Sequence, residues 1–117
     1  MTSAAAPLTS EDLATCCSPL TGGILDTASA ERLAGVFKAL ADPARVKLLS
    51  LIAASGEACV CDLTDPLGLT QPTVSHHIKM LVDTGFVSRE QRGKWAYYRV
   101  NNDALDKVAQ LISTGSI

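Results

Sequence analysis

The sequence predicts a mainly α-helical protein with one small β-hairpin. Residues 69–82 carry apolar side chains at the i, i+4, i+7 and i+8 spacing of an amphipathic helix. A short helical segment at residues 61–67 and then Gly68 come directly before it. Two runs rich in β-branched and aromatic residues, on either side of Gly93, come after it. Helix, glycine turn, helix and hairpin follow one another in the order of a winged helix-turn-helix.

The chain divides into an arm and one domain. Residues 1–28 are rich in Ala, Thr, Ser, Gly and Pro, which predicts a flexible N-terminal arm that carries the adjacent cysteines Cys16 and Cys17. Residues 29–114 are predicted to form one folded domain. No apolar run approaches the about 18 residues of a membrane span, and the N-terminus lacks a basic start followed by an apolar block. We therefore expect a cytoplasmic protein with no membrane partner.

Two helices are predicted at the start of the domain. The first covers residues 29–41, where apolar residues recur at helical spacing. The second begins with Asp42 as N-cap and Pro43 in the first turn, and it ends near Gly56. Its predicted core stripe consists of Val46, Leu49, Ile52 and Ala53.

The short helix at residues 61–67 is expected to be irregular. Pro66 lies inside it and cannot donate a hydrogen bond to the carbonyl of Asp62. The sequence therefore predicts a distorted or late-starting turn before Gly68.

The amphipathic segment that follows is predicted to be a helix with one buried and one exposed face. Thr70 can act as its N-cap, Pro72 lies in the first turn, and His77 is expected close to the buried flank. The buried stripe consists of Val74, Ile78, Leu81 and Val82. The other face displays hydroxyls, one imidazole and one lysine, which can contact DNA base edges and phosphates. These residues are Thr73 at the edge, Ser75, His76 and Lys79.

The predicted hairpin consists of residues 86–90 and 94–100 on either side of Gln91-Arg92-Gly93. Its tip carries Arg92 and Lys94, so this wing can reach a groove next to the one that the helix occupies. The aromatic residues of the second run are expected to pack within the wing, because stacking platforms serve single strands. They are Trp95, Tyr97 and Tyr98.

A last helix follows, with Asn102 as its expected cap. Helices at both ends of so small a domain have little core left to cover, which favours a dimer interface over packing of the last helix on its own subunit. The apolar face of the last helix is predicted to comprise Leu105, Val108 and Ile112, with Ala104 and Leu111 alongside.

The charge is unevenly distributed along the chain. Residues 1–70 carry four basic and eight acidic side chains, and residues 71–100 carry five basic and two acidic ones. The positive excess of three therefore begins at the predicted DNA-contact helix, although the net charge of the chain is −2. Local charge governs phosphate affinity, so the pattern is compatible with DNA as a partner and equally with an ordinary solvated surface.

The four cysteines form two pairs, Cys16-Cys17 on the arm and Cys59-Val60-Cys61 at the entry of the short helix. In a cytosolic chain, free thiols or metal ligands are favoured over structural disulfides. Thiolates select soft ions such as trivalent arsenic or antimony, cadmium, lead or zinc. Residues two apart in a helix point about 200° apart, so Cys59 and Cys61 can meet on one ion only if the first turn is unwound or begins at Cys61. Two small buried hydrophobic residues are the alternative for this pair.

Four segments together resemble the ArsR/SmtB family of metal-sensing winged-helix repressors. They are Lys38-Ala39-Leu40-Ala41-Asp42-Pro43-Ala44-Arg45, Cys59-Val60-Cys61-Asp62-Leu63, Gln71-Pro72-Thr73-Val74-Ser75-His76-His77 and Arg92-Gly93-Lys94-Trp95-Ala96-Tyr97-Tyr98. The resemblance covers about residues 29–113 and implies a homodimer that leaves its operator when an inducer binds. By resemblance, Cys59 and Cys61 match the thiolate motif, and Arg92 and Lys94 match the wing tip. The residues that match the DNA-contact face are Gln71, Thr73, Ser75, His76 and Lys79.

Two departures from the family pattern bear on the ligand. The arsenic sensors often add a third cysteine where this chain has Thr64. Cys16 and Cys17 resemble the N-terminal cysteines of the cadmium and lead sensors, and they can supply the missing ligands. The zinc sensors carry His and Asp ligands on the C-terminal helix, whereas residues 101–112 contain no His, so a zinc site is not expected there.

We therefore expect a repressor that binds double-stranded operator DNA and senses As(III) first, with Sb(III) close behind. Its three thiolates are predicted to be Cys16 and Cys17 with either Cys59 or Cys61. One alternative is Cd(II) or Pb(II) bound by all four thiolates, and another is a redox sensor in which the pairs form disulfides. An enzyme with a reactive cysteine and His77 as base is disfavoured, because no acid orients that histidine and no small-molecule substrate pocket is indicated.

Overall fold

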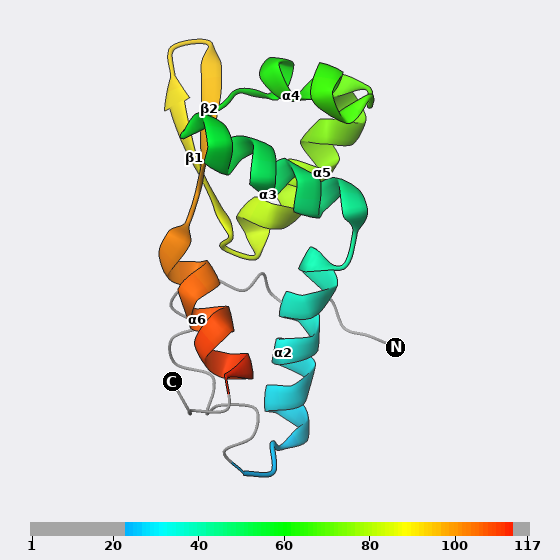
Figure 1. Cartoon of the computed structure of the whole chain (residues 1–117), viewed down its shortest axis with the longest axis vertical. Coiled ribbons are helices and arrows are strands. Elements are labelled where there is room, and N and C mark those ends of the chain that lie inside the picture. The colour runs from blue at the N-terminus through cyan, green and yellow to red at the C-terminus, as the bar shows by residue number, and fades with distance from the viewer. Residues whose placement is uncertain (1–22, 114–117) are drawn as a thin grey trace.

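The computed structural model describes residues 23–113, so Cys16, Cys17 and most of the predicted arm lie outside the described residues. The described part contains five helices and one antiparallel hairpin, which confirms the predicted fold class. In Figure 1, α2 and α6 occupy the lower half of the molecule, and the other helices and the hairpin occupy the upper half. The elements are α2 (Thr27–Leu40), α3 (Pro43–Ser55), α4 (Val60–Leu67), α5 (Gln71–Asp83), β1 (Val87–Arg92), β2 (Trp95–Val100) and α6 (Asn102–Ile112).

Side-chain caps fix where several helices begin. The Asp26 carboxylate accepts a hydrogen bond from the backbone N–H of Ser29 at 2.8 Å, so α2 begins two residues earlier than predicted. Asp42 caps α3 as predicted, by accepting from the N–H of Ala44 at 2.8 Å. The cap of α6 is Asn101 instead of Asn102.

The buried stripe predicted for α3 is partly wrong. Leu48 and Ile52 are fully buried, whereas Val46 keeps 53% of its surface exposed and Ala53 is also exposed. This helix is apolar on most sides, so its sequence offers several stripes at helical spacing and the neighbouring elements decide among them. In α6 the buried residues are Ala104, Val108 and Leu111, whereas Leu105 is only partly buried and Ile112 is exposed, so the apolar face predicted there is partly wrong.

The unit formed by α4, Gly68 and α5 is a helix, a glycine turn and a helix, as predicted. Gly68 adopts the left-handed conformation (φ 67°) and donates its N–H to the carbonyl of Thr64 at 2.9 Å, which ends α4. The expected late start is wrong, because α4 begins at Val60. Pro66 lies in the last turn of α4, where it still cannot donate a hydrogen bond to the carbonyl of Asp62.

Phe86 anchors the end of α5 to the wing and to α6. Its side chain is completely buried, and its N–H donates to the carbonyl of Leu81 at 2.9 Å. The N–H of Asn101 in turn donates to the carbonyl of Phe86 at 2.9 Å. One residue therefore fixes where α5, β1 and the start of α6 lie relative to one another.

Of the helices in residues 23–113, none has the length and apolar character needed to cross a membrane.

The hairpin turn is shorter than predicted. Arg92 pairs with Trp95 across the two strands, which leaves only Gly93 and Lys94 in the turn. Gly93 has a positive φ of 61°, as a two-residue hairpin turn requires. Gln91 and Arg92 therefore belong to β1, and Lys94 alone of the two predicted tip cations lies in the turn.

Candidate nucleic-acid interface and thiol pair

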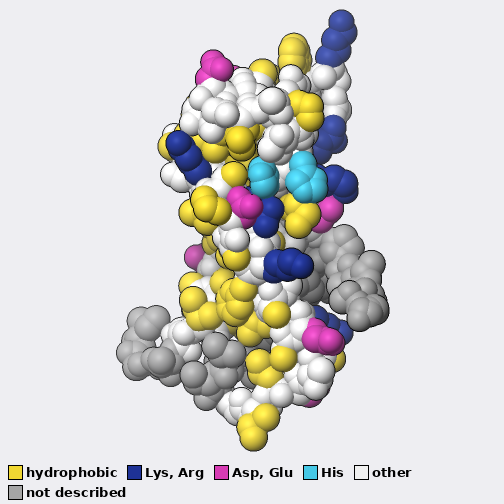
Figure 2. Space-filling view, turned by 90° about the vertical axis from the view of Figure 1, so that its right-hand side faces the viewer, with side chains coloured by type: hydrophobic (Ala, Val, Ile, Leu, Met, Phe, Trp, Pro, Cys, Tyr) yellow, Lys and Arg dark blue, Asp and Glu magenta, His cyan; other side chains and the backbone are white. Residues whose placement is uncertain are grey.

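One face of α5 is buried and the other faces solvent. Val74, Ile78 and Leu81 are at most 1% exposed, which confirms the predicted stripe at these positions, while Val82 is half-buried. The chain has two histidines, His76 and His77, and both lie on α5. Figure 2 shows them on the surface, with Lys and Arg side chains nearby. The residues predicted to contact DNA are all exposed on this helix, namely Gln71, Thr73, Ser75, His76 and Lys79.

Two of these exposed residues have polar partners on α5 or at its cap. Lys79 Nζ lies 3.1 Å from Asp83 Oδ2, one helical turn along the same surface. Thr70 is the N-cap of α5, as predicted, but its hydroxyl caps no backbone N–H and lies 2.9 Å from the Thr73 hydroxyl. Exposed pairs of this kind contribute little to stability, so both Lys79 and Thr73 can exchange these partners for others at low cost.

Arg45 connects α5 to the end of α2. Its side chain is only 11% exposed. Nε donates to the carbonyl of Ala39 at 2.7 Å, Nη2 donates to the carbonyl of Lys38 at 3.3 Å, and Nη1 lies 3.2 Å from His77 Nδ1. His77 therefore points toward the inner flank, as predicted, and one guanidinium both caps α2 and orients α5.

The guanidinium of Arg92 is held against two carboxylates. Nη1 and Nη2 donate to the two carboxylate oxygens of Glu57 at 2.6 and 3.0 Å, and Nη2 also donates to Glu90 at 2.8 Å. The same guanidinium lies over the Tyr97 ring, 4.7 Å from its centroid. Arg92 was predicted as a DNA contact at the tip, but it lies in β1 and is already paired. Of the aromatic residues predicted to pack in the wing, Tyr98 is buried, whereas Trp95 is 58% exposed.

The sequence did not indicate Glu57. It also accepts hydrogen bonds from Arg99, at 3.2 Å from Nε and 3.0 Å from Nη2. Hydrogen bonds from Arg92 and Arg99 lower the pKa of Glu57 to about 2, so it is ionised at neutral pH. Glu57 precedes the two arginines by 35 and 42 positions, and no local pattern signals such a contact. Arg92 and Arg99, which belong to the basic segment 71–100, are thus partly neutralised by Glu57, which belongs to the acidic segment 1–70.

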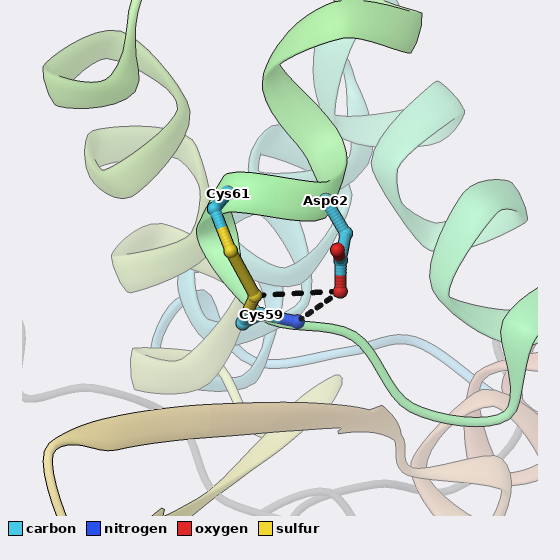
Figure 3. Close-up of side chains that lie close together, drawn as sticks. All are labelled: Cys59, Cys61 and Asp62. Atoms are coloured by element: carbon cyan, nitrogen blue, oxygen red, sulfur yellow. Dashed lines mark hydrogen bonds between the residues drawn. A yellow bond between two sulfur atoms is a disulfide. The ribbon is translucent and has the colours of Figure 1, made fainter.

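The thiol pair, Cys59 and Cys61, lies at the start of α4 (Figure 3). Their Cα atoms are 5.4 Å apart and the two sulfurs are joined as a disulfide. Cys59 is the extended N-cap (φ −97°, ψ 168°), and of the two cysteines only Cys61 lies in the helix. The divergence expected of two helical residues therefore does not arise, and α4 begins one residue before the start at Cys61 that the sequence required for a shared ion. This boundary turns the two side chains toward each other. For the same reason the structure pairs the two sulfurs, where the sequence favoured free thiols.

Asp62 lies next to the thiol pair and was also missed. Its Oδ2 accepts the backbone N–H of Cys59 at 3.2 Å and lies 3.3 Å from Cys59 Sγ. The two sulfurs and a carboxylate oxygen of Asp62 all lie within 4.8 Å of one another, so the reduced pair and Asp62 could hold one ion. Cys59 is buried, but Cys61 and Asp62 are exposed, so an ion or a further ligand can approach from solvent. The spacing of Cys59 and Asp62 fits an N-cap and its N3 partner, which was the available sequence signal.

Comparison with known proteins identifies related sequences. Residues 42–89 match the family model described as bacterial regulatory protein, arsR family. An uncharacterized HTH-type transcriptional regulator of Methanocaldococcus jannaschii is 38% identical over 82 residues, which are 70% of this chain and 92% of that protein. The arsenical resistance operon repressor of Staphylococcus xylosus is 39% identical over 82 residues, or 70% and 78% of the two chains. A cadmium resistance transcriptional regulatory protein CadC homolog of Staphylococcus aureus is 33% identical over 78 residues, or 67% and 64%.

A solved structure of similar fold is the homodimeric winged helix-turn-helix DNA-binding domain of a possible ArsR-family transcriptional regulator from Mycobacterium bovis. It matches with a TM-score of 0.62 and 30% identity, over 76% of this chain and 84% of that chain. The order of helices and hairpin described above is thus the winged helix-turn-helix arrangement.

Proposed function

The chain belongs to the arsR family of bacterial regulatory proteins, and from that premise we propose that it is a homodimeric repressor that leaves operator DNA when arsenite or antimonite binds its cysteine thiolates. Members of this family are DNA-binding regulators, so the chain is not an enzyme. Because operator DNA lies in the cytoplasm of a bacterial cell, the proposal assigns the protein to that compartment.

The exposed face of α5 supports the DNA-binding part of the proposal. It presents side chains suited to base edges and phosphates, on a helix fixed from behind by its buried stripe and by Arg45. Lys94 is exposed in the hairpin turn and offers a further cation for a phosphate. In a dimer, two such helices would contact half-sites about one helical turn apart.

The apolar surfaces of α2 and α6 support a dimer. Phe37, Leu40 and Leu105 are only partly buried, and Ile112 is 53% exposed. Figure 2 shows hydrophobic side chains gathered over the lower half of the molecule, the half that holds these helices in Figure 1. Burial of such a surface against a second copy is favourable, and the related domain from Mycobacterium bovis is a homodimer.

The observation that carries the proposal is the convergence of two sulfurs at the start of α4, the helix that leads through Gly68 into α5. Once reduced, the thiol pair can supply two thiolates to one soft ion. Cys16 or Cys17 would add the third thiolate that As(III) requires. We propose this ligand set in place of Cys16 and Cys17 with either Cys59 or Cys61, because Cys59 lies outside the helix and the two sulfurs can then meet on one ion.

A four-thiolate Cd(II) or Pb(II) sensor is the alternative within the same family, and one relative is named as a cadmium resistance regulator. Both arm cysteines would then bind, and Asp62 offers an oxygen close to the thiol pair. Ultraviolet thiolate-to-metal absorption and a count of protected thiols distinguish three thiolates from four.

A redox response is a second candidate function, because the structure already joins Cys59 and Cys61. Two thiols and one hydrogen peroxide would give one disulfide and two waters, with the thiols oxidised and the peroxide reduced. Release from DNA by peroxide without any metalloid, reversed by a dithiol reductant, supports this function. Unchanged binding after peroxide excludes it.

The first prediction concerns the repressor and its inducer together. The reduced protein is expected to bind a promoter fragment upstream of its own gene, and stoichiometric arsenite should weaken that binding about 10- to 100-fold. Fluorescence anisotropy at fixed salt measures both affinities. Tight binding that arsenite leaves unchanged would reject arsenite as the inducer and direct the search to cadmium, lead or oxidation.

A second prediction distinguishes the ligand sets. If Cys59 and Cys61 both bind, Cys59→Ser and Cys61→Ser should each abolish arsenite-driven release, while Cys16→Ser and Cys17→Ser each retain a partial response. The double substitution of the arm cysteines should abolish it. Unchanged DNA affinity without arsenite is the control for each variant. A full response in Cys59→Ser or Cys61→Ser restores the original expectation, and a full response without both arm cysteines removes the arm from the site.

A further inference from the structure

We propose that Glu57 transmits the state of the thiol pair to the wing, as a positioning residue that holds Arg92 and Arg99. The inference rests on the proposed function, in which the wing lies close to DNA. It concerns three side chains that we call the Glu57 clasp, namely Glu57, Arg92 and Arg99.

The clasp begins two residues before the thiol pair. Glu57, Ala58 and Cys59 are consecutive in the sequence, and each one contacts a different part of the molecule. Glu57 holds the two arginines, Ala58 exchanges backbone hydrogen bonds of 3.0 and 2.8 Å with Tyr98 of β2, and Cys59 is the N-cap of α4. Ala58 therefore forms an isolated antiparallel bridge with the wing, directly before the sulfur-bearing Cys59. A displacement of Cys59 is transmitted to Glu57 through only two peptide units.

The clasp governs the charge of the wing as well as its position. Glu57 and Glu90 oppose Arg92 and Arg99, so two positive and two negative groups meet at one place. The contact of Glu57 with Arg92 is bidentate, which fixes the plane of the guanidinium over Tyr97. When Glu57 moves, both arginines lose the carboxylate that they share, and Arg92 keeps only Glu90 and Tyr97 as partners. Glu90 cannot transmit this signal, because it lies on β1 itself.

The matched variants are Glu57→Gln and Glu90→Gln, which each remove one negative charge beside Arg92. Both should bind operator DNA at least as tightly as the unmodified protein, because an anion near phosphate is lost. In the unmodified protein and in Glu90→Gln, arsenite should weaken binding about 10- to 100-fold. In Glu57→Gln, we expect a change of no more than about twofold, although the variant still binds arsenite with the same stoichiometry. Release of DNA by arsenite to an equal extent from the two variants overturns the proposal.

A second measurement needs no DNA. The chain has one tryptophan, Trp95, and it pairs with Arg92 across the hairpin, so its fluorescence reports on the wing. Arsenite should shift Trp95 emission in the unmodified protein and in Glu90→Gln, but not in Glu57→Gln. Arg99→Gln removes one of the two arginines that Glu57 holds, so its arsenite-dependent shift of Trp95 emission should be intermediate. This variant keeps the test available if Glu57→Gln does not fold.

The two measurements separate the inference from the proposed function. If arsenite shifts Trp95 emission in the unmodified protein and in Glu90→Gln but not in Glu57→Gln, and releases DNA from none of them, the proposed function fails and the clasp stands. If arsenite releases DNA equally from every variant, the proposed function stands and the clasp fails. The clasp is also overturned if bound arsenite leaves the Trp95 emission of the unmodified protein unchanged.

Discussion

Replacing Ser75 with Glu is expected to lower operator affinity by about 100-fold, or about 3 kcal/mol. Ser75 is exposed near the middle of the proposed DNA-contact face of α5. A carboxylate at this position would face phosphates and base acceptors at close range, and like-charge contacts in an interface cost several kcal/mol. Anisotropy with a labelled operator at fixed salt measures the loss.

The control is the same substitution on another helix. Ser50 is also exposed, on α3, so Ser50→Glu changes the charge by the same amount away from the proposed interface. Both variants should unfold at nearly the temperature of the unmodified protein, because a substitution at an exposed helical position changes the free energy of unfolding by only about 0.5 kcal/mol or less. If Ser50→Glu weakens binding as much as Ser75→Glu does, net charge controls affinity and α5 is not the contact helix.

The sequence predicted α5 better than α3 for a physical reason. Polar residues on α5 leave one apolar stripe, so helical spacing alone identifies Val74, Ile78 and Leu81 as buried. Along α3 nearly every side is apolar, and packing against the neighbouring elements selects Leu48 over Val46. Burial could therefore be predicted where the pattern was unique.

The thiol pair shows how a shift of one residue in the start of a helix changes the geometry of a site. With Cys59 inside the helix, the two sulfurs diverge. With Cys59 as N-cap, they converge at a Cα separation of 5.4 Å. Helix ends are the least certain part of any pattern, so periodicity could identify the cysteines but not their geometry. Contacts across the chain, such as Glu57 with Arg92, depend on the assembled fold and leave no local pattern.

Replacing Phe86 with Ala is expected to destabilise the protein by about 3–5 kcal/mol. The side chain is fully buried, and a Phe to Ala change at such a site removes apolar contacts and leaves a cavity. Domains have a free energy of unfolding of about 5–15 kcal/mol, so the loss is a large fraction of the total. Because Phe86 anchors the end of α5, operator affinity should fall as well. Urea unfolding followed by circular dichroism measures the change in free energy.

Phe37 provides the matched control, because it is the other phenylalanine of the chain and lies half-buried on α2. Phe37→Ala removes the same atoms from a surface that the proposed dimer would cover. Its effect should therefore be smaller than that of Phe86→Ala and should shrink further on dilution, because stabilisation by association is lost from the unmodified protein and the variant alike once both are monomeric. The loss in Phe86→Ala should persist at every concentration. If the two variants lose the same free energy of unfolding at every protein concentration, Phe37 belongs to the core of one subunit. That result would argue against α2 as part of the dimer interface.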